Sequence, residues 1–289
     1  MTYRGRFAPS PTGALHFGSL VAAVGSWLAA RASGGAWLVR IEDIDPPREV
    51  PGSAQDILAT LAAFGLEADE PIVYQSRRTA AYQSAFEQLQ RSGQVFPCWC
   101  SRSDLEPAGG VHRGPCVAAP DDSRRPAWRV RVPEINIDFD DAIAGRQSLA
   151  LAAEGDFVVR RVEGWYAYQL AVVVDDAFQA ITDIVRGADL LESTPRQIHL
   201  QHLLGLPTPR YAHLPLVLDG EGRKLSKQDR AVPVDRADPM RALRAALSFL
   251  GLSDVGYGAA NPAALLRAAS RGFDLDHVRT RSNAHAAAR

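Results

Sequence analysis

The chain has 289 residues, of which 46% are hydrophobic and 22% are charged, and its formal net charge is −1. This composition is typical of a globular protein with one large or two modest domains, and it excludes a strongly basic surface as the basis of nucleic-acid binding. The longest apolar stretch, 20–32, is too short to cross a bilayer, and the amino terminus has no signal segment. We therefore expect a cytoplasmic protein without a membrane partner.

The first third of the chain alternates between strand and helix patterns. Short extended runs at 5–8 and 37–41 alternate with helical patterns at 15–31 and 53–64. This order predicts a parallel βαβ unit.

A second series of the same kind follows later in the chain. Strands are predicted at 156–162 and 180–185, and helices at 168–177 and 194–204, so the two series are interpreted as halves of one open α/β sheet. The stretch between them is rich in Pro, Gly, Cys and Arg and has little helical periodicity, which indicates an insertion.

Two more helical patterns, at 239–250 and 262–269, precede an alanine-rich tail that we expect to be disordered. The predicted fold class is an α/β Rossmann-type fold with an inserted subdomain and a short C-terminal helical subdomain. We expect the first half of the Rossmann-type domain at 1–95, the insertion at 96–141 and the second half at 142–210. A lysine loop with the helical subdomain follows at 211–280, and the tail at 281–289.

Residues 6–19 read as a strand, a Pro/Gly turn and the start of a helix, with the sequence Arg-Phe-Ala-Pro-Ser-Pro-Thr-Gly-Ala-Leu-His-Phe-Gly-Ser. A helix amino terminus attracts phosphate. We expect His16 in the first helical turn with a donor facing a triphosphate, and Gly18 to leave room for an adenine or ribose. The alternative is an ordinary surface histidine beside a packing glycine.

The strand predicted at 37–41 ends in three carboxylates, Glu42, Asp43 and Asp45. Open α/β sheets bind ligands at this carboxyl edge. A carboxylate here can hold an ammonium group or, through water, a magnesium ion, whereas a solvated turn that caps the next helix explains Asp43 and Asp45 equally well. Glu42 is therefore kept as a site residue.

Lysine is confined to one short loop. Of 32 basic residues only Lys224 and Lys227 are lysines, and they flank Ser226 in the sequence Gly-Arg-Lys-Leu-Ser-Lys-Gln. Because lysine is a compact, mobile charge suited to transient phosphate contacts, its retention here favours a nucleotide-binding role over an ordinary solvated turn.

The three cysteines of the chain also cluster, as Cys98 and Cys100 followed by His112 and Cys116. Four such ligands are typical of a closed tetrahedral Zn²⁺ site, which would stabilise an insertion poor in apolar side chains. Three buried free thiols are the alternative, and so is a site of three cysteines completed by water.

The combination of these motifs resembles the class I aminoacyl-tRNA synthetases. Their His-Ile-Gly-His and Lys-Met-Ser-Lys-Ser signatures are similar to His-Phe-Gly-Ser at 16–19 and Lys-Leu-Ser-Lys-Gln at 224–228. The Arg-Phe-Ala-Pro-Ser-Pro-Thr-Gly opening and the Arg-Ile-Glu-Asp-Ile-Asp run resemble the glutamyl branch over nearly the whole chain. The resemblance implies ATP, carried with Mg²⁺, and L-glutamate as substrates of a monomeric ligase.

The resemblance also implies roles for particular residues. Arg6 and Arg186 would bind the two carboxylates of glutamate, Glu42 its ammonium group, and Tyr168 would form the pocket wall, with 7–10 as neighbours. Which arginine takes which carboxylate stays open. His16 and Lys227 would be the catalytic residues. The other implied glutamate-binding positions are Phe7, Ala8, Pro9 and Ser10. ATP would be bound by His16 and Lys227 together with Gly18, Ser19, Lys224 and Ser226.

Only about sixty residues follow Gln228, which leaves no room for the large anticodon-reading domain of full-length glutamyl-tRNA synthetases. This truncation resembles a short branch of the family, and implies that glutamate is transferred to queuosine at the wobble position of tRNA(Asp). Backbone contacts to that tRNA are predicted from Arg77, Arg78, Arg124, Arg125, Arg129 and Arg131. The competing hypotheses are a minimal synthetase that charges the tRNA 3′ end and a non-catalytic tRNA-binding paralogue.

Overall fold

The first βαβ unit forms as predicted in the computed structural model, which describes residues 2–217, 233–276 and 278. β1 (Arg4–Phe7) pairs in parallel with β2 (Ala36–Ile41), which in turn pairs in parallel with β3 (Val73–Tyr74). α1 (Phe17–Ala32) follows β1, and α2 (Ser53–Ala63) lies between β2 and β3. The four expected elements are thus confirmed to within a few residues.

A second sheet, which is mixed, lies beside the first. Its strand order is β7-β6-β10-β9, and all neighbours are parallel except the β6–β7 hairpin. The N–H of Thr182 donates to the carbonyl of Arg4 at 3.0 Å, which brings β9 beside β1. The bounds of these strands are Asn136–Asp141 for β6, Gly145–Ala150 for β7, Asp183–Gly187 for β9 and Arg210–Leu214 for β10.

β9 begins three residues later than the strand predicted at 180–185. Ala180 has a φ of 50°, a left-handed conformation that non-glycine residues rarely adopt. This conformation ends the turn after α6 (Tyr168–Phe178), so the extended chain starts only beyond it.

The third sheet is antiparallel and contains β4 (Val95–Cys98), β5 (Ala127–Val130) and β8 (Phe157–Arg160). The prediction that the strand at 156–162 lies in the parallel sheet is therefore wrong. Phe157 and Val159 are buried while Val158 and Arg160 are half-buried. Such alternation is typical of an antiparallel strand with one covered face. The sequence does not show it, because Phe157, Val158 and Val159 are all apolar.

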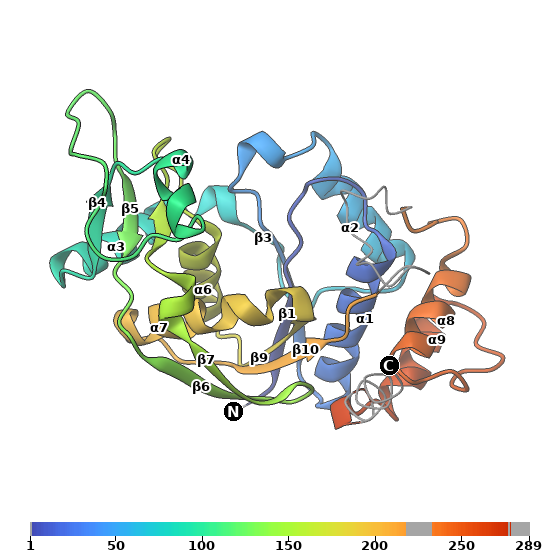
Figure 1. The fold of residues 1–289 in the computed structure, drawn as a ribbon. Coiled ribbons are helices and arrows are strands. Elements are labelled where there is room, and N and C mark those ends of the chain that lie inside the picture. The colour runs from blue at the N-terminus through green and yellow to red at the C-terminus, as the bar shows by residue number, and fades with distance from the viewer. Residues whose placement is uncertain (1, 218–232, 277, 279–289) are drawn as a thin grey trace.

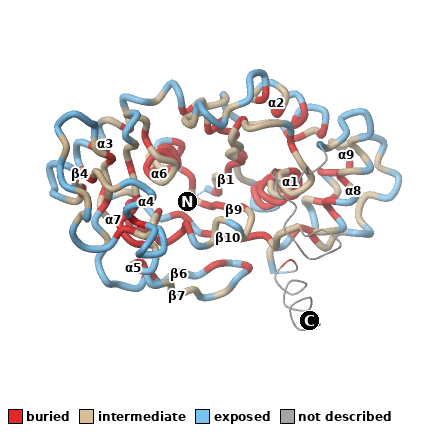
Figure 2. The backbone as a smooth tube through the Cα atoms, turned by 45° about the horizontal axis from the view of Figure 1, so that its top comes forward, coloured by how far each residue is buried: buried red, intermediate tan, exposed pale blue. Residues whose placement is uncertain are grey.

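Helices cover both faces of the central strands (Figure 1). α1 packs against β1 and β9 on one face and is itself covered by α8 (Pro239–Phe249) and α9 (Pro262–Ser270). On the other face α6 packs against α7 (Thr194–Leu204). Because α1 is covered on several sides, Leu20, Ala23, Val24 and Leu28 are fully buried, and Figure 2 shows the buried backbone concentrated around α1, β9 and β10.

The remaining helices are short or peripheral. α3 (Thr79–Arg91) packs against α6, while α4 (Arg102–Leu105) and α5 (Leu151–Glu154) lie near the insertion and the β6–β7 hairpin. The 3₁₀ helices are Pro46–Arg48, Gln75–Arg77, Glu106–Ala108 and Ala188–Ser193. Among the described residues no helix is long and apolar enough to span a membrane. The tail predicted at 281–289 lies outside the described residues.

Candidate active site

A cavity of about 690 Å³ opens at the carboxyl ends of β1, β2, β9 and β10. Its walls include the last residues of these strands and the residues that follow them, which is where open parallel sheets bind ligands. Every glutamate-binding position predicted in the described part of the chain lines it, and so do His16, Gly18 and Ser19. The fold therefore brings two separately predicted motifs to one site.

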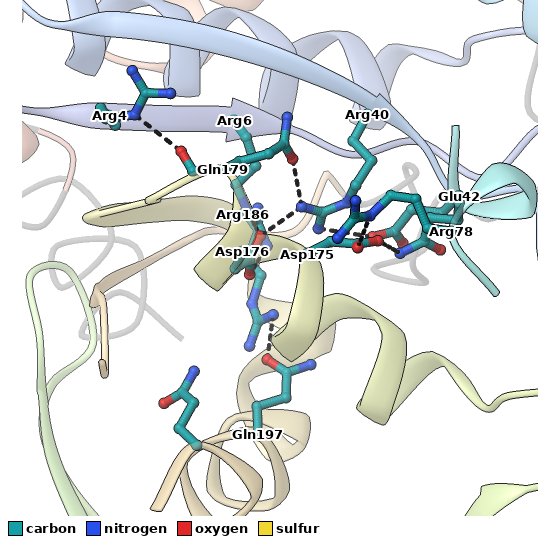
Figure 3. A network of polar contacts seen from close by, with 12 residues as sticks. Arg4, Arg6, Arg40, Glu42, Arg78, Asp175, Asp176, Gln179, Arg186 and Gln197 are labelled. Atoms are coloured by element: carbon teal, nitrogen blue, oxygen red, sulfur yellow. Dashed lines mark hydrogen bonds and ion pairs between the residues drawn. The ribbon is translucent and has the colours of Figure 1, made fainter. Parts of the chain in front are cut away.

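A network of buried charges supports one wall of this cavity, and Figure 3 shows its polar contacts. Arg6 and Glu42 line the cavity. Nε and Nη2 of Arg6 donate to the two oxygens of Asp176 at 3.1 and 3.4 Å. Arg40 donates from Nη1 to Asp176 Oδ1 at 2.8 Å and from Nη2 to Glu42 Oε1 at 3.1 Å. Arg40 is completely buried, and the other three residues are nearly so. Two arginines thus share two carboxylates, and Asp176 lies between the arginines.

This sharing has opposite effects on the two carboxyl groups. Burial opposes the charge on Asp176, but Arg6 and Arg40 outweigh it and lower the pKa of Asp176. Burial dominates at Glu42 and raises its pKa, although Arg40 and Arg6 oppose the shift. Glu42 is therefore the acidic side chain of this wall that is least compensated, which suits a residue that receives an ammonium group.

Arg6 retains donors for a ligand. Its two hydrogen bonds both go to Asp176 and use Nε and one N–H of Nη2. Of the three remaining N–H groups, one on Nη1 and one on Nη2 form the planar two-pronged edge that suits a carboxylate. Since Arg6 lines the cavity, this edge is available to a substrate there.

Arg186, on β9, lines the same cavity and is held by polar groups without charge. Its guanidinium donates to His213 Nε2 at 3.0 Å, to Gln197 Oε1 at 2.8 Å, to Thr194 Oγ1 at 2.9 Å and to the carbonyl of Leu190 at 3.3 Å. In the described part of the chain no carboxylate contacts it. A buried cation without a carboxylate partner attracts an anion.

The other predicted glutamate-binding residues line the same cavity. Tyr168, the first residue of α6, lines the cavity, and burial raises its pKa so that the phenol keeps its proton. Residues 8–10 form the turn after β1, and the carbonyl of Pro9 accepts from the N–H of Glu42 at 3.0 Å. Phe7 packs in the core, with its ring stacked on Trp37.

His16 is the N-cap of α1 rather than a residue of its first turn. Its Nδ1 accepts from the N–H of Ser19 at 3.2 Å, so the proton lies on Nε2, which is 3.0 Å from Ser19 Oγ. A Cβ at Gly18 would lie 3.3 Å from Nδ1 and Cε1 of the same ring. Glycine therefore lets the imidazole fold over the helix start, where phosphate binding is expected.

The predicted ATP-binding residues Lys224, Ser226 and Lys227 lie outside the described residues. On either side of that segment, Val217 lines the cavity and Pro233 forms an isolated antiparallel bridge with His16. The described residues on both sides of this segment therefore lie near the cavity and His16.

The predicted metal ligands also come together. One donor atom from each of Cys98, Cys100, His112 and Cys116 lies within 4.8 Å of all the others. Nδ1 of His112 is 2.9 Å from Asp156 Oδ2, while Nε2 faces the sulfur of Cys116 at 3.5 Å. A histidine that uses one nitrogen for a carboxylate and turns the other toward thiols has the arrangement of a metal ligand.

The predicted tRNA arginines do not share one environment. Arg78 donates to the buried Asp175 at 2.5 Å and stacks on the exposed ring of Phe178, and Arg129 donates to the carbonyl of Asp156. Arg77 stacks on Tyr74, and Arg125 is exposed. Structural roles therefore account for part of the set.

Sequence reasoning missed several polar residues that build the site, namely Arg40, Asp141, Asp176, Gln197 and His213. Two signals were present in the sequence. Arg40 precedes Glu42 by two residues at the end of an extended run, which places both side chains on one face. Asp175 and Asp176 interrupt an otherwise apolar helix, and buried carboxylates require a partner.

The parallel strands, the helix start with His16 and the cavity at the strand ends define a nucleotide-binding α/β domain of the class I synthetase type. Residues 2–261 match the family model described as tRNA synthetases class I (E and Q), catalytic domain. The chain belongs to this family.

Curated relatives agree along most of their length. The chain is 57% identical over 280 residues to the Glutamyl-Q tRNA(Asp) synthetase of Xanthomonas campestris pv. campestris (strain 8004), covering 96% of this chain and 91% of the relative. It is 56% identical over 267 residues to the protein of the same name from Burkholderia cenocepacia (strain J2315), covering 88% and 90%.

A solved structure shows the same fold in a longer protein. The glutamate tRNA ligase from Elizabethkingia meningosepticum, in complex with its amino acid, superposes with a TM-score of 0.77 at 27% identity. The match covers 96% of this chain but only 66% of that ligase.

Proposed function

We propose that the chain activates L-glutamate with ATP and transfers it to queuosine at the wobble position of tRNA(Asp). The observation that carries the first step is the shared cavity, in which two guanidinium groups and a buried carboxylate lie beside the helix start of His16. The acceptor is proposed from relatives that are 55–61% identical to the chain and are named Glutamyl-Q tRNA(Asp) synthetases.

Glutamate has two carboxylates and one ammonium group, and the cavity offers a partner for each. The free edge of Arg6 and the charge of Arg186 would bind the carboxylates, and Glu42 would receive the ammonium group. Tyr168 lines the same cavity, and its protonated hydroxyl can donate a hydrogen bond. A neutral or cationic amino acid would leave at least one buried charge unpaired.

The first step needs no side-chain nucleophile. A carboxylate oxygen of glutamate attacks the α-phosphorus of ATP, the bond to the β-phosphate oxygen breaks, and pyrophosphate leaves. Catalysis then depends on alignment and on stabilising the added negative charge. The N-terminus of α1 and the Nε2–H of His16 are the described groups that can supply this stabilisation, and Lys227 remains a predicted one.

Magnesium would enter with the phosphates of ATP and neutralise part of their charge. Two carboxylates of the cavity are already paired, Glu42 with Arg40 and Asp45 with Arg48 and Arg161. An ion carried mainly by the nucleotide and water therefore suits this site better than a cage of protein carboxylates.

In the second step a hydroxyl of the cyclopentenediol of queuosine attacks the acyl carbon of glutamyl-adenylate. An ester forms, AMP leaves, and the hydroxyl proton is lost to solvent or phosphate. Recognition of the anticodon stem-loop would rest on shape and phosphate contacts, because single-stranded loops present splayed bases to a pocket. A monomeric state and a cytoplasmic location remain predictions.

The test is transfer of labelled glutamate to tRNA(Asp) prepared with and without queuosine, followed by nuclease cleavage. We expect label only with queuosine, and only on the anticodon fragment. Label on the 3′ fragment would establish 3′ charging instead. Absence of glutamate-dependent ATP–pyrophosphate exchange would exclude both enzymatic functions and favour the tRNA-binding paralogue.

We also propose that Cys98, Cys100, His112 and Cys116 hold a structural Zn²⁺. The donor set supports this, since four nitrogen or sulfur atoms within 4.8 Å of one another match a closed tetrahedral site. The ion would join β4 to the loop that precedes β5. Between the two strands, in 99–126, Leu105 is the one buried apolar side chain, so the metal would supply stability there.

Replacing Cys116 by serine should remove most of the bound zinc from the purified protein, because a three-ligand site binds the ion far more weakly. The measurement is metal content by atomic absorption, with Asp122→Asn, an exposed residue of the same loop, as the matched control. Equal zinc content in Cys116→Ser and the wild type would contradict the proposed ligand set.

A further inference from the structure

The buried side chains of Arg186, His213 and Asp141 form a hydrogen-bonded chain that runs from the cavity across three neighbouring strands. Arg186 Nε donates to His213 Nε2 at 3.0 Å, and His213 Nδ1 is 2.6 Å from Asp141 Oδ2. The three residues come from three neighbouring strands, β9, β10 and β6. The side chains of His213 and Asp141 have no exposed surface, and neither residue lines the cavity.

The hydrogen bonds determine the protonation of the imidazole. Nε2 must lack a proton because it accepts from the guanidinium of Arg186, so the single proton lies on Nδ1 and is donated to Asp141. Burial lowers the pKa of His213, although Asp141 opposes the shift, and this favours the neutral ring. A doubly protonated ring would place a second N–H donor against that of Arg186.

In this arrangement Asp141 compensates the charge of Arg186 through the imidazole of His213 and does not form a direct ion pair with Arg186. Arg6 meets its carboxylate directly, whereas Arg186 meets an imidazole and the carboxylate lies one residue behind it. A direct Asp141–Arg186 pair would occupy the guanidinium edge and weaken its attraction for an incoming anion. The imidazole lets Asp141 stabilise the arrangement while Arg186 keeps its charge toward the cavity.

Arg186 is also restricted in orientation. Its four hydrogen bonds leave one of the five guanidinium N–H groups, on Nη1, without a partner in the described part of the chain. The Tyr211 ring lies 5.4 Å from its guanidinium carbon and stacks on His213. A single donor is useful only when its direction is fixed, and the contact with His213 fixes the Nε side.

We propose that His213, oriented by Asp141, is a positioning residue that aims Arg186 at a carboxylate of the substrate. Asp141 is suited to this because its Oδ1 also accepts from the backbone N–H groups of Ile143 and Ala144 at 3.0 and 2.8 Å. The carboxylate is therefore held by the turn between β6 and β7. The chain of contacts makes this distant turn part of glutamate recognition.

The test rests on the proposed function and uses glutamate-dependent ATP–pyrophosphate exchange with the full chain. His213→Asn keeps a donor toward Asp141 but cannot reach Arg186, while His213→Gln places an amide oxygen near the position of Nε2. We expect the asparagine variant to raise the KM for glutamate about tenfold or more, with the KM for ATP and kcat nearly unchanged. The glutamine variant should restore the KM to within about threefold.

His199→Asn is the matched control, because His199 is a buried histidine of α7 that does not line the cavity. It should leave the KM for glutamate unchanged. An unchanged KM in His213→Asn, or an equal rise in the KM for ATP, would overturn the inference. Absence of exchange in the wild type would instead overturn the proposed function.

If His213→Asn does not fold, Asp141→Asn provides the test. An asparagine amide can donate to Nδ1 and move the ring proton to Nε2, where it faces the Arg186 donor. The KM for glutamate should then rise about tenfold or more, and a folded Asp141→Asn protein with the wild-type KM would refute the proposal.

Discussion

Replacing Glu42 by glutamine should lower kcat/KM for glutamate in ATP–pyrophosphate exchange by about 100-fold. Glutamine has nearly the same shape, so the fold should persist, and Arg40 keeps its ion pair with Asp176. What is lost is the negative charge opposite the substrate ammonium group. Since Glu42 is 7% exposed, water cannot replace that charge efficiently.

Asp43→Asn is the control for this variant. Asp43 is the next residue, but its oxygens accept from the N–H and hydroxyl of Ser76 at 2.9 and 2.7 Å, and it does not line the cavity. Its exchange activity should stay within about twofold of the wild type. Equal losses in the two variants would indicate general damage to the segment rather than a substrate contact.

The raised pKa of Glu42 should make the exchange activity depend on pH. Its ordinary value is 4.5, and burial moves the midpoint upward. Because the ionised form binds the ammonium group, kcat/KM should fall as the pH drops through this raised value. Glu42→Gln should lack that acid limb, which pH profiles of exchange activity can measure.

The sequence predicted the order of strands and helices well because local patterns determine it. The run 6–19 reads as a strand, a Pro/Gly turn and a helix start in immediate succession. The structure has β1 and the start of α1 in this run. The cysteine cluster was predictable for a similar reason, since all its ligands lie within a short stretch.

The errors concerned partners that are distant in the sequence. β8 has an apolar run suited to either a parallel or an antiparallel sheet, and only its pairing with β5 distinguishes the two. Arg186 was predicted as a site residue, but its contact with His213 depends on how two strands align, with His213 opposite Arg186 in the register. No local pattern contains that information.

The charged wall of the cavity is a further example. Asp176 contacts Arg6 and Arg40, which are 170 and 136 residues away in the chain. A sequence reveals that a buried carboxylate on α6 needs a cation, but not which of many arginines supplies it. In a chain with about thirty arginines the choice is made by the fold.

Replacing Asp176 by asparagine should lower the free energy of unfolding by about 3–5 kcal/mol, because it leaves two buried guanidinium groups short of one charge. Arg40 keeps Glu42 and Gln179 as partners. Arg6 loses one of its two acceptors, because the asparagine amide keeps one oxygen but presents an N–H donor in place of the other. Urea denaturation at neutral pH measures the change. Asp138→Asn, on the exposed face of β6, should shift the midpoint little.

The stability lost in Asp176→Asn should itself depend on pH. The pKa of Asp176 is lowered from 3.8 in the folded chain by Arg6 and Arg40, which outweigh burial. The ionised carboxylate therefore contributes its full stabilisation above the unfolded value, and this contribution disappears as the pH falls through the lowered folded value. The difference between wild type and Asp176→Asn should narrow below pH 3.8, and a constant difference across that range would show that packing, not charge, accounts for the loss.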